Sequence, residues 1–301
     1  MTADIRDHPR LAHDDIVALN FVRKKVPFIF RRHYRTGLRS HIMEVLNPVD
    51  VRHQEEGVTI DGVRWFPRPA PLKMLRIFRT RFEELESADE ELDRVRMVNQ
   101  YLGPDYVAGS EEFLVDYRSG GRRDRLLCGL QEYVTGEVID PWGRLDSTYL
   151  MSLMGRLRSR KAFPVGITAE EWLVRVRDMA QAFLRRLQRM IENEKLIPDL
   201  AGVGNLLITP SGRMKLVDIN NISAISSGSA ISLDDRGYPV CDKSIQALFI
   251  LQEKVAGDSG DADALYQRFL DPERMKQVEA MVRRFHLNMA SCAGASSYPR
   301  G

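Results

Sequence analysis

The feature that most limits how this chain can fold is a long amphipathic segment over residues 168–192. Apolar residues recur through it at helical spacing: Trp172, Val176, Met179, Phe183, Leu187 and Met190. Thr168 is followed three positions later by Glu171, the pairing that makes a capping box at a helix N-terminus. A stripe of this length needs a large apolar surface to cover it, so we expect this helix within a hydrophobic core.

From Glu44 to Val134 the sequence predicts mainly strands with one clear helix, and beyond Thr135 it predicts mainly helices. Asp61-Gly62 predicts a tight turn between two short strands, and Ser119-Gly120-Gly121 predicts a second hairpin. The expected strands cover residues 58–66, 72–78, 113–117 and 126–134, and the other expected helices cover 11–21, 88–102, 146–160, 243–255 and 272–287. A capping box over residues 87–90 would open the helix that carries Glu91. Strands first and helices later are typical of an α+β fold.

Composition narrows the class of protein further. The 301 residues are 44% hydrophobic, which suffices for a sizeable core, and the net charge of +2 does not indicate a general polyanion binder. Cys128, Cys241 and Cys292 are far apart and form no C-x-x-C pair, which argues against a disulfide framework or a zinc site. No apolar run is long enough for a transmembrane helix, and residues 1–10 lack the apolar core of a secretory signal. We therefore expect a cytoplasmic protein.

Residues 16–43 contain no acidic side chain but many basic ones, interleaved with aromatic residues. The cations are Arg23, Lys24, Lys25, Arg31, Arg32, Arg35 and Arg39. Such a pattern can bind phosphates or an anionic membrane face. Because the global charge is near zero, the pattern is more typical of a solvated arm or of a segment that packs on acidic parts of its own protein. We treat residues 1–43 as a basic N-terminal arm with an anionic surface as its possible partner.

The segment that follows the long helix carries the clearest chemistry. Residues 196–222 predict a loop with Asp199 and Asn205, a strand over 206–209, a Pro-Ser-Gly turn, and a strand over 214–217 that ends at Asp218. Such a hairpin would bring three oxygen ligands together, and Mg²⁺ prefers carboxylate and amide oxygens. The alternative is that these residues only make turns, since Asp and Asn hydrogen-bond readily to their own backbone.

This stretch resembles the catalytic loop and metal-binding segment of the protein-kinase-like superfamily, which includes protein kinases and aminoglycoside-phosphotransferase-type enzymes. Asn205 and Asp218 are thirteen positions apart, as is usual in that family. The resemblance implies a two-lobed fold that transfers the γ-phosphoryl group of ATP to a hydroxyl of a protein or small molecule. It gives Asp199 the role of general base or of orienting the acceptor, and Asn205 and Asp218 the role of Mg²⁺ ligands.

The resemblance also assigns a nucleotide site in a small lobe over residues 44–134. Lys73 would contact phosphates and pair with Glu91, and the backbone of Glu132, Tyr133 and Val134 would bind adenine. Residues 135–287 would form the helical large lobe, followed by a flexible tail over 288–301.

Several residues depart from the family pattern. Asp199 and Asn205 are six positions apart where the family usually has five, and Ala201 stands where protein kinases carry Lys. Ile197-Pro198 precedes Asp199 in place of His-Arg or His-Gly, Ile219-Asn220 follows Asp218 in place of Phe-Gly, and no glycine-rich loop precedes Lys73. These differences keep a second interpretation open, a pseudokinase that retains the fold as a nucleotide-binding or partner-binding module.

Overall fold

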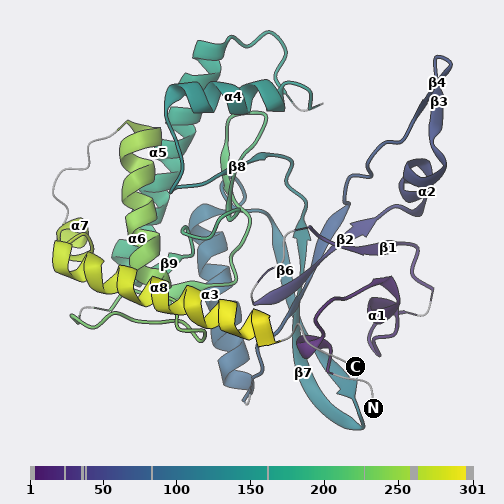
Figure 1. Ribbon diagram of the computed structural model, residues 1–301, viewed down its shortest axis with the longest axis horizontal. Helices are drawn as coiled ribbons and strands as arrows, with labels where there is room; N and C mark the ends of the chain where they lie inside the picture. Colours follow the sequence, from purple (N-terminus) through teal and green to yellow (C-terminus); the bar gives the residue numbers. More distant parts are fainter. Residues whose placement is uncertain are drawn as a thin grey trace. The chain divides into compact units, whose positions relative to one another are not determined.

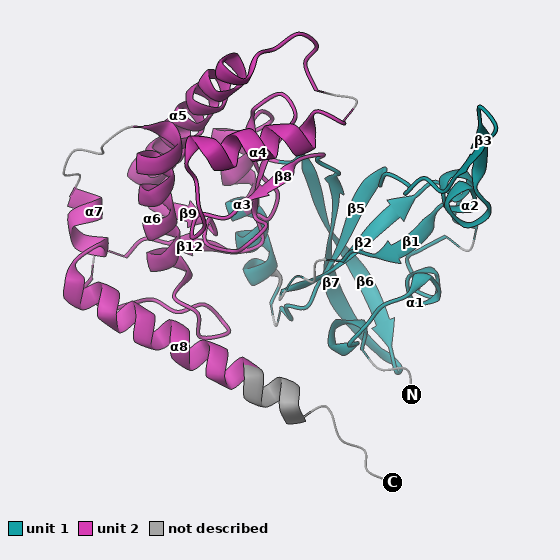
Figure 2. Cartoon of the chain, turned by 45° about the horizontal axis from the view of Figure 1, so that its top comes forward, with its two compact units in different colours: residues 1–94, 108–134 teal, residues 95–107, 135–301 magenta. Residues whose placement is uncertain are grey.

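The computed structural model describes residues 4–23, 25–34, 37, 39–82, 84–160, 163–226, 228–257 and 264–295. Strands dominate the first part of the chain and helices the second, so the protein is a mixed α+β structure (Figure 1). The chain divides into two compact units: unit 1 contains Met1–Arg94 and Ala108–Val134, and unit 2 contains Val95–Val107 and Thr135–Gly301 (Figure 2). The expected α+β class is confirmed.

Unit 1 is built on an antiparallel sheet of five strands in the order β1-β2-β5-β7-β6. The strands are β1 (Ile29–Arg32), β2 (Ser40–Leu46), β5 (Lys73–Phe78), β6 (Ser110–Ser119) and β7 (Arg122–Glu132). Gly120 and Gly121 join β6 to β7 with φ angles of 56° and 82°, which residues with a side chain rarely adopt. The expected hairpin over these residues is therefore confirmed, with longer strands.

The N-terminal residues belong to unit 1 and do not form a separate arm. They contain a 3₁₀ turn, η1 (Ile5–Asp7), and a short helix, α1 (His13–Val17). Their apolar side chains are buried with those of the sheet: Ile5, Leu11, Ile16, Leu19 and Phe30 lie in one cluster with Met43, Ile77 and Leu126. This corrects the expectation for residues 1–43, because the segment supplies part of the core and its last residues enter β2.

A helix and a small hairpin lie between β2 and β5. Asn47 caps α2 (Pro48–Glu56) by accepting a hydrogen bond from the backbone of Val49. The hairpin pairs β3 (Val58–Ile60) with β4 (Val63–Trp65), and Asp61 and Gly62 at its turn have φ angles of 51° and 77°. The predicted tight turn is thus confirmed.

Helix α3 (Leu85–Leu102) begins earlier than its expected capping box, since Ser87 lies inside its first turn. Leu85 and Glu86 are good helix formers, so the helix extends to them. Its last part lies in unit 2, where Val95, Val98 and Leu102 are buried in the core.

Unit 2 is mainly helical. Its helices are α4 (Ser147–Leu157), α5 (Ala169–Glu194), α6 (Val240–Leu251), α7 (Ala264–Phe269) and α8 (Pro272–Ala295), and a π-helical turn, η2 (Gln252–Ala256), follows α6. The capping box of α5 is present, and Trp172, Phe183 and Leu187 are fully buried. Met179 is only half-buried, and Ala180 takes the buried position beside it. Helix α8 continues to Ala295, so the chain remains helical beyond the expected start of a tail at residue 288.

Short strands in unit 2 frame the segment that follows α5. The pair β10 (Leu206–Ile208) and β11 (Met214–Leu216) forms the predicted hairpin, and β8 (Glu137–Ile139) joins it on the other side. A second pair, β9 (Leu196–Pro198) with β12 (Ile222–Ala224), was not expected from the sequence. Among the helices that the structure describes, none is long and apolar enough to cross a bilayer.

Candidate functional site

The candidate loop is the segment between β9 and β12, which contains Asp199, Asn205 and Asp218. The pairing of β9 with β12 holds its two ends together. Pro198 stands opposite Ile222 in this pairing, and the backbone N–H of Asp199 donates to the carbonyl of Asn221 at 2.9 Å. Helix α5 ends just before β9 because Lys195 adopts a left-handed conformation, with a φ of 54°. The chain therefore enters the loop through β9, directly after α5, and leaves it after Asp218 through β12, which lies beside β9.

Asp199 makes a turn with its own loop. Its Oδ1 accepts hydrogen bonds from the backbone N–H groups of Ala201 at 2.9 Å and Gly202 at 3.1 Å. The backbone N–H of Leu200 donates to the hydroxyl of Ser244 in α6 at 3.2 Å. The two loop amides engage Oδ1 alone, so Oδ2 stays outside these bonds, and the half-buried side chain keeps some contact with solvent.

Asn205 stabilises the loop through two hydrogen bonds. Its Nδ2 donates to the carbonyl of Asp199 at 2.9 Å, and its backbone carbonyl accepts from the N–H of Val217 at 2.8 Å. Gly202 gives the amide room, because a Cβ at that position would lie 2.5 Å from Asn205 Nδ2. The amide nitrogen is thereby used within the loop, and Oδ1 is the atom that remains to accept from, or to ligate, another group.

Asp218 stands close to Asp199. Burial and the negative charge of Asp218 raise the pKa of Asp199 to about 6, although the N–H groups of Ala201 and Gly202 act to lower it. Asp218 Oδ1 accepts from the backbone N–H of Asn220 at 3.1 Å, which orients its carboxylate. The structure thus brings together the three residues that the sequence predicted, Asp199, Asn205 and Asp218.

Their chemistry suits a hard cation. Two carboxylates and an amide oxygen are the ligands that Mg²⁺ takes from proteins, with its other positions filled by water or phosphate. Over the described ranges, no group of three or more His, Cys, Asp and Glu side chains gathers in a way that could hold a metal ion. A cation at the candidate site would therefore depend on a ligand such as phosphate to complete its shell.

Three side chains that the sequence analysis missed surround this loop. Trp142 Nε1 donates to the carbonyl of Ala201 at 3.0 Å, and the Lys243 ammonium lies 3.8 Å from the centroid of the Trp142 ring. Burial raises the pKa of Tyr238 to about 12, with added effects from the charges of Asp199 and Asp234. Tryptophan occurs three times in the chain, and its place in the polar Asp-Pro-Trp-Gly turn was a signal that could have identified Trp142.

The expected nucleotide residues lie in unit 1. Lys73 begins β5 and stands opposite Glu132 in the register of β5 with β7, so these two residues share one end of the sheet. The Glu132 backbone N–H donates to the carbonyl of Gly109 at 2.7 Å. Tyr133 and Val134 follow the end of β7, where Tyr133 is exposed and Val134 is half-buried.

Glu91 lies on α3, as expected, and is half-buried. Its carboxylate is 3.8 Å from Arg94 on the same helix. Lys73 is exposed at the start of β5, so its pairing with Glu91 stays a prediction.

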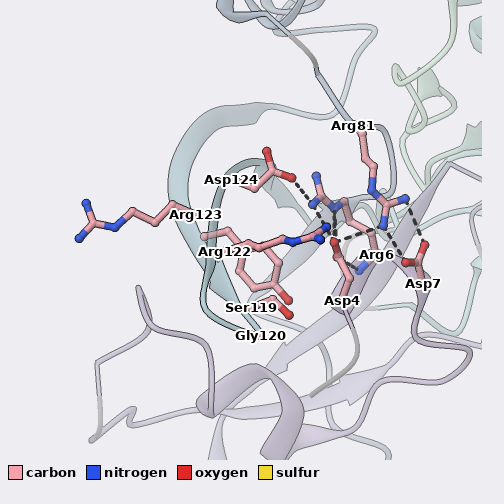
Figure 3. Close-up of a pocket in the computed structure, with 10 residues that line it drawn as sticks. Asp4, Arg6, Asp7, Arg81, Ser119, Gly120, Arg122, Arg123 and Asp124 are labelled. Atoms are coloured by element: carbon pink, nitrogen blue, oxygen red, sulfur yellow. Dashed lines mark hydrogen bonds and ion pairs between the residues drawn. The ribbon is translucent and has the colours of Figure 1, made fainter. Parts of the chain in front are cut away.

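A second cluster of charges in unit 1 also escaped the sequence analysis. It lines a pocket of about 620 Å³, in which the guanidinium groups of Arg6 and Arg81 meet the carboxylates of Asp4 and Asp7 (Figure 3). Arg6 also pairs with Asp124 of β7. The Arg6–Asp124 pair ties the N-terminal segment to the β6–β7 hairpin, so the arrangement serves the fold of unit 1.

Some basic residues of the segment expected to bind an anionic partner form ion pairs within unit 1. Arg31 and His33 both contact Glu44, at 2.8 Å and 2.9 Å. Arg23 and Lys25 are exposed, whereas Lys24 and Arg35 lie outside the described residues. Intramolecular pairing of Arg31 and His33 agrees with the alternative that part of this segment packs on its own protein.

Comparison of the sequence with protein-family models finds no match, and comparison with curated proteins finds none either. The functional interpretation therefore rests on the site residues themselves.

Proposed function

We propose that the protein is a kinase-like phosphotransferase that uses ATP and Mg²⁺ to phosphorylate a hydroxyl group. The observation that carries this proposal is the convergence of Asp199, Asn205 and Asp218, with the Asp218 charge acting on Asp199. This is the combination of oxygen ligands and a poised carboxylate that phosphoryl transfer requires. The resemblance of residues 196–222 to the kinase catalytic and metal-binding segments supports the same function.

The geometry of the loop supports the roles that the resemblance implies. Asn205 and Asp218 would hold Mg²⁺, since Asn205 presents Oδ1 and Asp218 presents a carboxylate. Asp199 would accept or orient the acceptor hydroxyl through Oδ2, the oxygen outside the two loop hydrogen bonds. Bound Mg²⁺ would neutralise charge on the phosphates, and the loop would supply positioning.

Nucleotide binding would fall to the unit 1 residues. Lys73 would contact phosphates, and the segment from Glu132 to Val134 would contact adenine. Support comes from the order of elements, because a strand with Lys73 is followed by a helix with Glu91 and then by a hairpin that ends at Glu132. The Glu132 N–H is used by Gly109, which leaves the backbone of Tyr133 and Val134 as the more suitable part of the expected hinge.

A pseudokinase is the second candidate, favoured by one feature of the loop. Asp199 Oδ1 is engaged by Ala201 and Gly202, as in a structural Asp turn, and Ala201 brings no cation to the loop. In this case the chain would bind a nucleotide or partner without transferring phosphate.

Thermal unfolding with ATP and MgCl₂ tests the nucleotide site, and release of ADP tests turnover. Ligand at 100 times its Kd stabilises a folded protein by about 2.7 kcal/mol. We expect a Mg²⁺-dependent rise in Tm for the wild type that is lost in Asp218→Asn. Asp178→Asn, on the exposed face of α5, is the matched control and should keep the response.

The outcomes separate the candidates. Turnover that is lost in Asp199→Asn supports the enzyme. A Tm shift without turnover supports the pseudokinase. A wild type that responds to no nucleotide contradicts the proposal.

A further inference from the structure

Lys243 has an unusual environment for a lysine. It lies in the first turn of α6 and is half-buried, with its Nζ 3.8 Å from the centroid of the Trp142 ring. The ammonium donates to Gln246 Oε1 at 2.7 Å. Both neighbours favour a cation, one through its π face and one through a neutral amide oxygen.

No carboxylate forms an ion pair with Lys243 among the residues that the structure describes. Burial lowers the pKa of Lys243, and the more distant charge of Glu279 in α8 acts in the opposite direction. A partly desolvated ammonium without a close counter-ion reduces the stability of the fold. An anion that bound here would remove this penalty.

The position of Lys243 connects it to the candidate catalytic loop. Trp142, which the ammonium contacts, donates from Nε1 to the carbonyl of Ala201. The next residue of α6, Ser244, accepts from the N–H of Leu200. Lys243 is thus linked to the segment that positions Asp199 in two indirect ways, through the Trp142 ring and through its neighbour Ser244.

Solvent can reach this place. The Trp142 side chain is 38% exposed, and Val203 at the tip of the loop is 70% exposed. A small molecule could therefore reach the exposed part of the Trp142 ring, beside the half-buried ammonium.

We propose that Lys243, Trp142 and Gln246 form a subsite for an oxyanion, a carboxylate or a phosphate group, beside the Asp199 loop. If the protein is a phosphotransferase, as proposed above, its acceptor carries this anionic group in addition to the hydroxyl that is phosphorylated. Binding of the anion at this subsite does not depend on catalysis.

Calorimetric titration with inorganic phosphate and with acetate tests the subsite. EDTA is present and ATP is absent, so that a metal-bound nucleotide site cannot contribute, and sodium chloride at equal ionic strength serves as the blank. The variants are Lys243→Met, Lys243→Arg and, as a matched lysine on the exposed part of η2, Lys254→Met. The two titrants distinguish a phosphate from a carboxylate ligand.

We expect the wild type to bind at least one of the two anions. Lys243→Met should weaken binding by about ten- to a hundredfold, the effect of losing one charge-assisted hydrogen bond. Lys243→Arg should retain most of the affinity, and Lys254→Met should bind as the wild type does. Without anion, Lys243→Met should have the same Tm as the wild type or a higher one, because an unpaired cation is removed.

Two results would overturn the subsite: no binding of either anion by the wild type, or equal binding by Lys243→Met. Failure of the phosphotransferase proposal looks different, since anion binding then depends on Lys243 while ATP gives neither a Tm shift nor turnover. ATP turnover without binding of either anion would retain the enzyme and remove the subsite.

Discussion

Asp242 and Arg274 form a buried, two-pronged ion pair between α6 and α8. Arg274 Nε donates to Asp242 Oδ1 at 2.5 Å, and Arg274 Nη2 donates to Oδ2 at 3.1 Å. The two side chains are 1% and 10% exposed. Arg274 Nη1 donates to the carbonyl of Ser229, and its guanidinium lies over the Phe269 ring. One arginine therefore organises the junction of α6, α7 and α8.

Replacement of Asp242 by Asn should lower the free energy of unfolding by about 3–5 kcal/mol, because it leaves the Arg274 charge buried without its partner. Urea unfolding followed by circular dichroism measures this loss. The exposed pair of Glu273 and Lys276 is the matched control, with side chains 74% and 70% exposed. Glu273→Gln should change stability by less than about 1 kcal/mol. Similar losses in both variants would mean that burial does not decide the strength of these pairs.

Replacement of glycine by alanine should have different effects at Gly202 and at Gly155. Gly202→Ala would place a Cβ 2.5 Å from Asn205 Nδ2, so the amide must move away from the Asp199 carbonyl. Gly155→Ala meets nothing within 4 Å on the exposed face of α4 and should stabilise the protein by about 0.5–1 kcal/mol. Thermal unfolding with and without MgCl₂ and ATP reports both effects. An unchanged nucleotide response in Gly202→Ala would show that the Asn205 position is not needed for binding.

His41 should make the protein sensitive to mild acid. Burial and the Arg79 charge lower the pKa of His41 to about 4, from 6.5. The ring holds Ile5 by donating from Nε2 to its carbonyl at 2.9 Å, and its Nδ1 accepts from Arg79 at 3.3 Å. Because the folded pKa is below the unfolded one, the neutral form stabilises the fold above pH 6.5, and this contribution is lost as the pH falls toward 4.

With allowance for solvent screening, we expect a loss on the order of 1–2 kcal/mol across this range. Urea unfolding at several pH values for the wild type and for His41→Gln measures the difference. The slope between pH 6.5 and 4 should be shallower in the variant. Parallel curves would exclude His41 as the titrating group.

Two cysteines should resist alkylation in the native protein. Burial raises the pKa of Cys128 to about 12, and burial together with the Asp242 charge raises the pKa of Cys241 to about 12. Thiolate is the reactive form, so iodoacetamide at pH 8 should label neither residue until urea unfolds the chain. Peptide mapping by mass spectrometry identifies the labelled positions. Rapid native labelling of Cys128 would indicate local opening of β7.

Local patterns were enough to predict the elements that depend on local chemistry. The capping box at Thr168 and the apolar stripe from Trp172 onward predicted α5, and the Asp61-Gly62 pair predicted the β3–β4 turn. The β9–β12 pairing was missed because three-residue strands far apart in the chain carry no periodic signal. The N-terminal segment was misjudged because its basic residues outweighed the spacing of Leu11, Ile16 and Leu19.

In the candidate site, too, the residues on one local stretch could be predicted and those from distant segments could not. Asp199, Asn205 and Asp218 could be predicted because they lie on one short stretch of sequence with a recognisable spacing. Trp142 and Lys243 could not, since they come from segments before and after that stretch. In the folded protein Trp142 contacts Ala201, and Lys243 contacts Trp142. Contacts of this kind depend on tertiary packing, which a single sequence does not display.

The loop between β9 and β12 is tied at its far end as well as at its base. Trp172 Nε1, in the buried part of α5, donates to the carbonyl of Pro210 at 3.1 Å, and Gly212 packs beside Val176. The backbone amides of the β10–β11 hairpin should therefore exchange with deuterium only when α5 itself opens. A ligand would meet a segment that is already ordered, so its arrival should follow a single kinetic phase, without a slow rearrangement step.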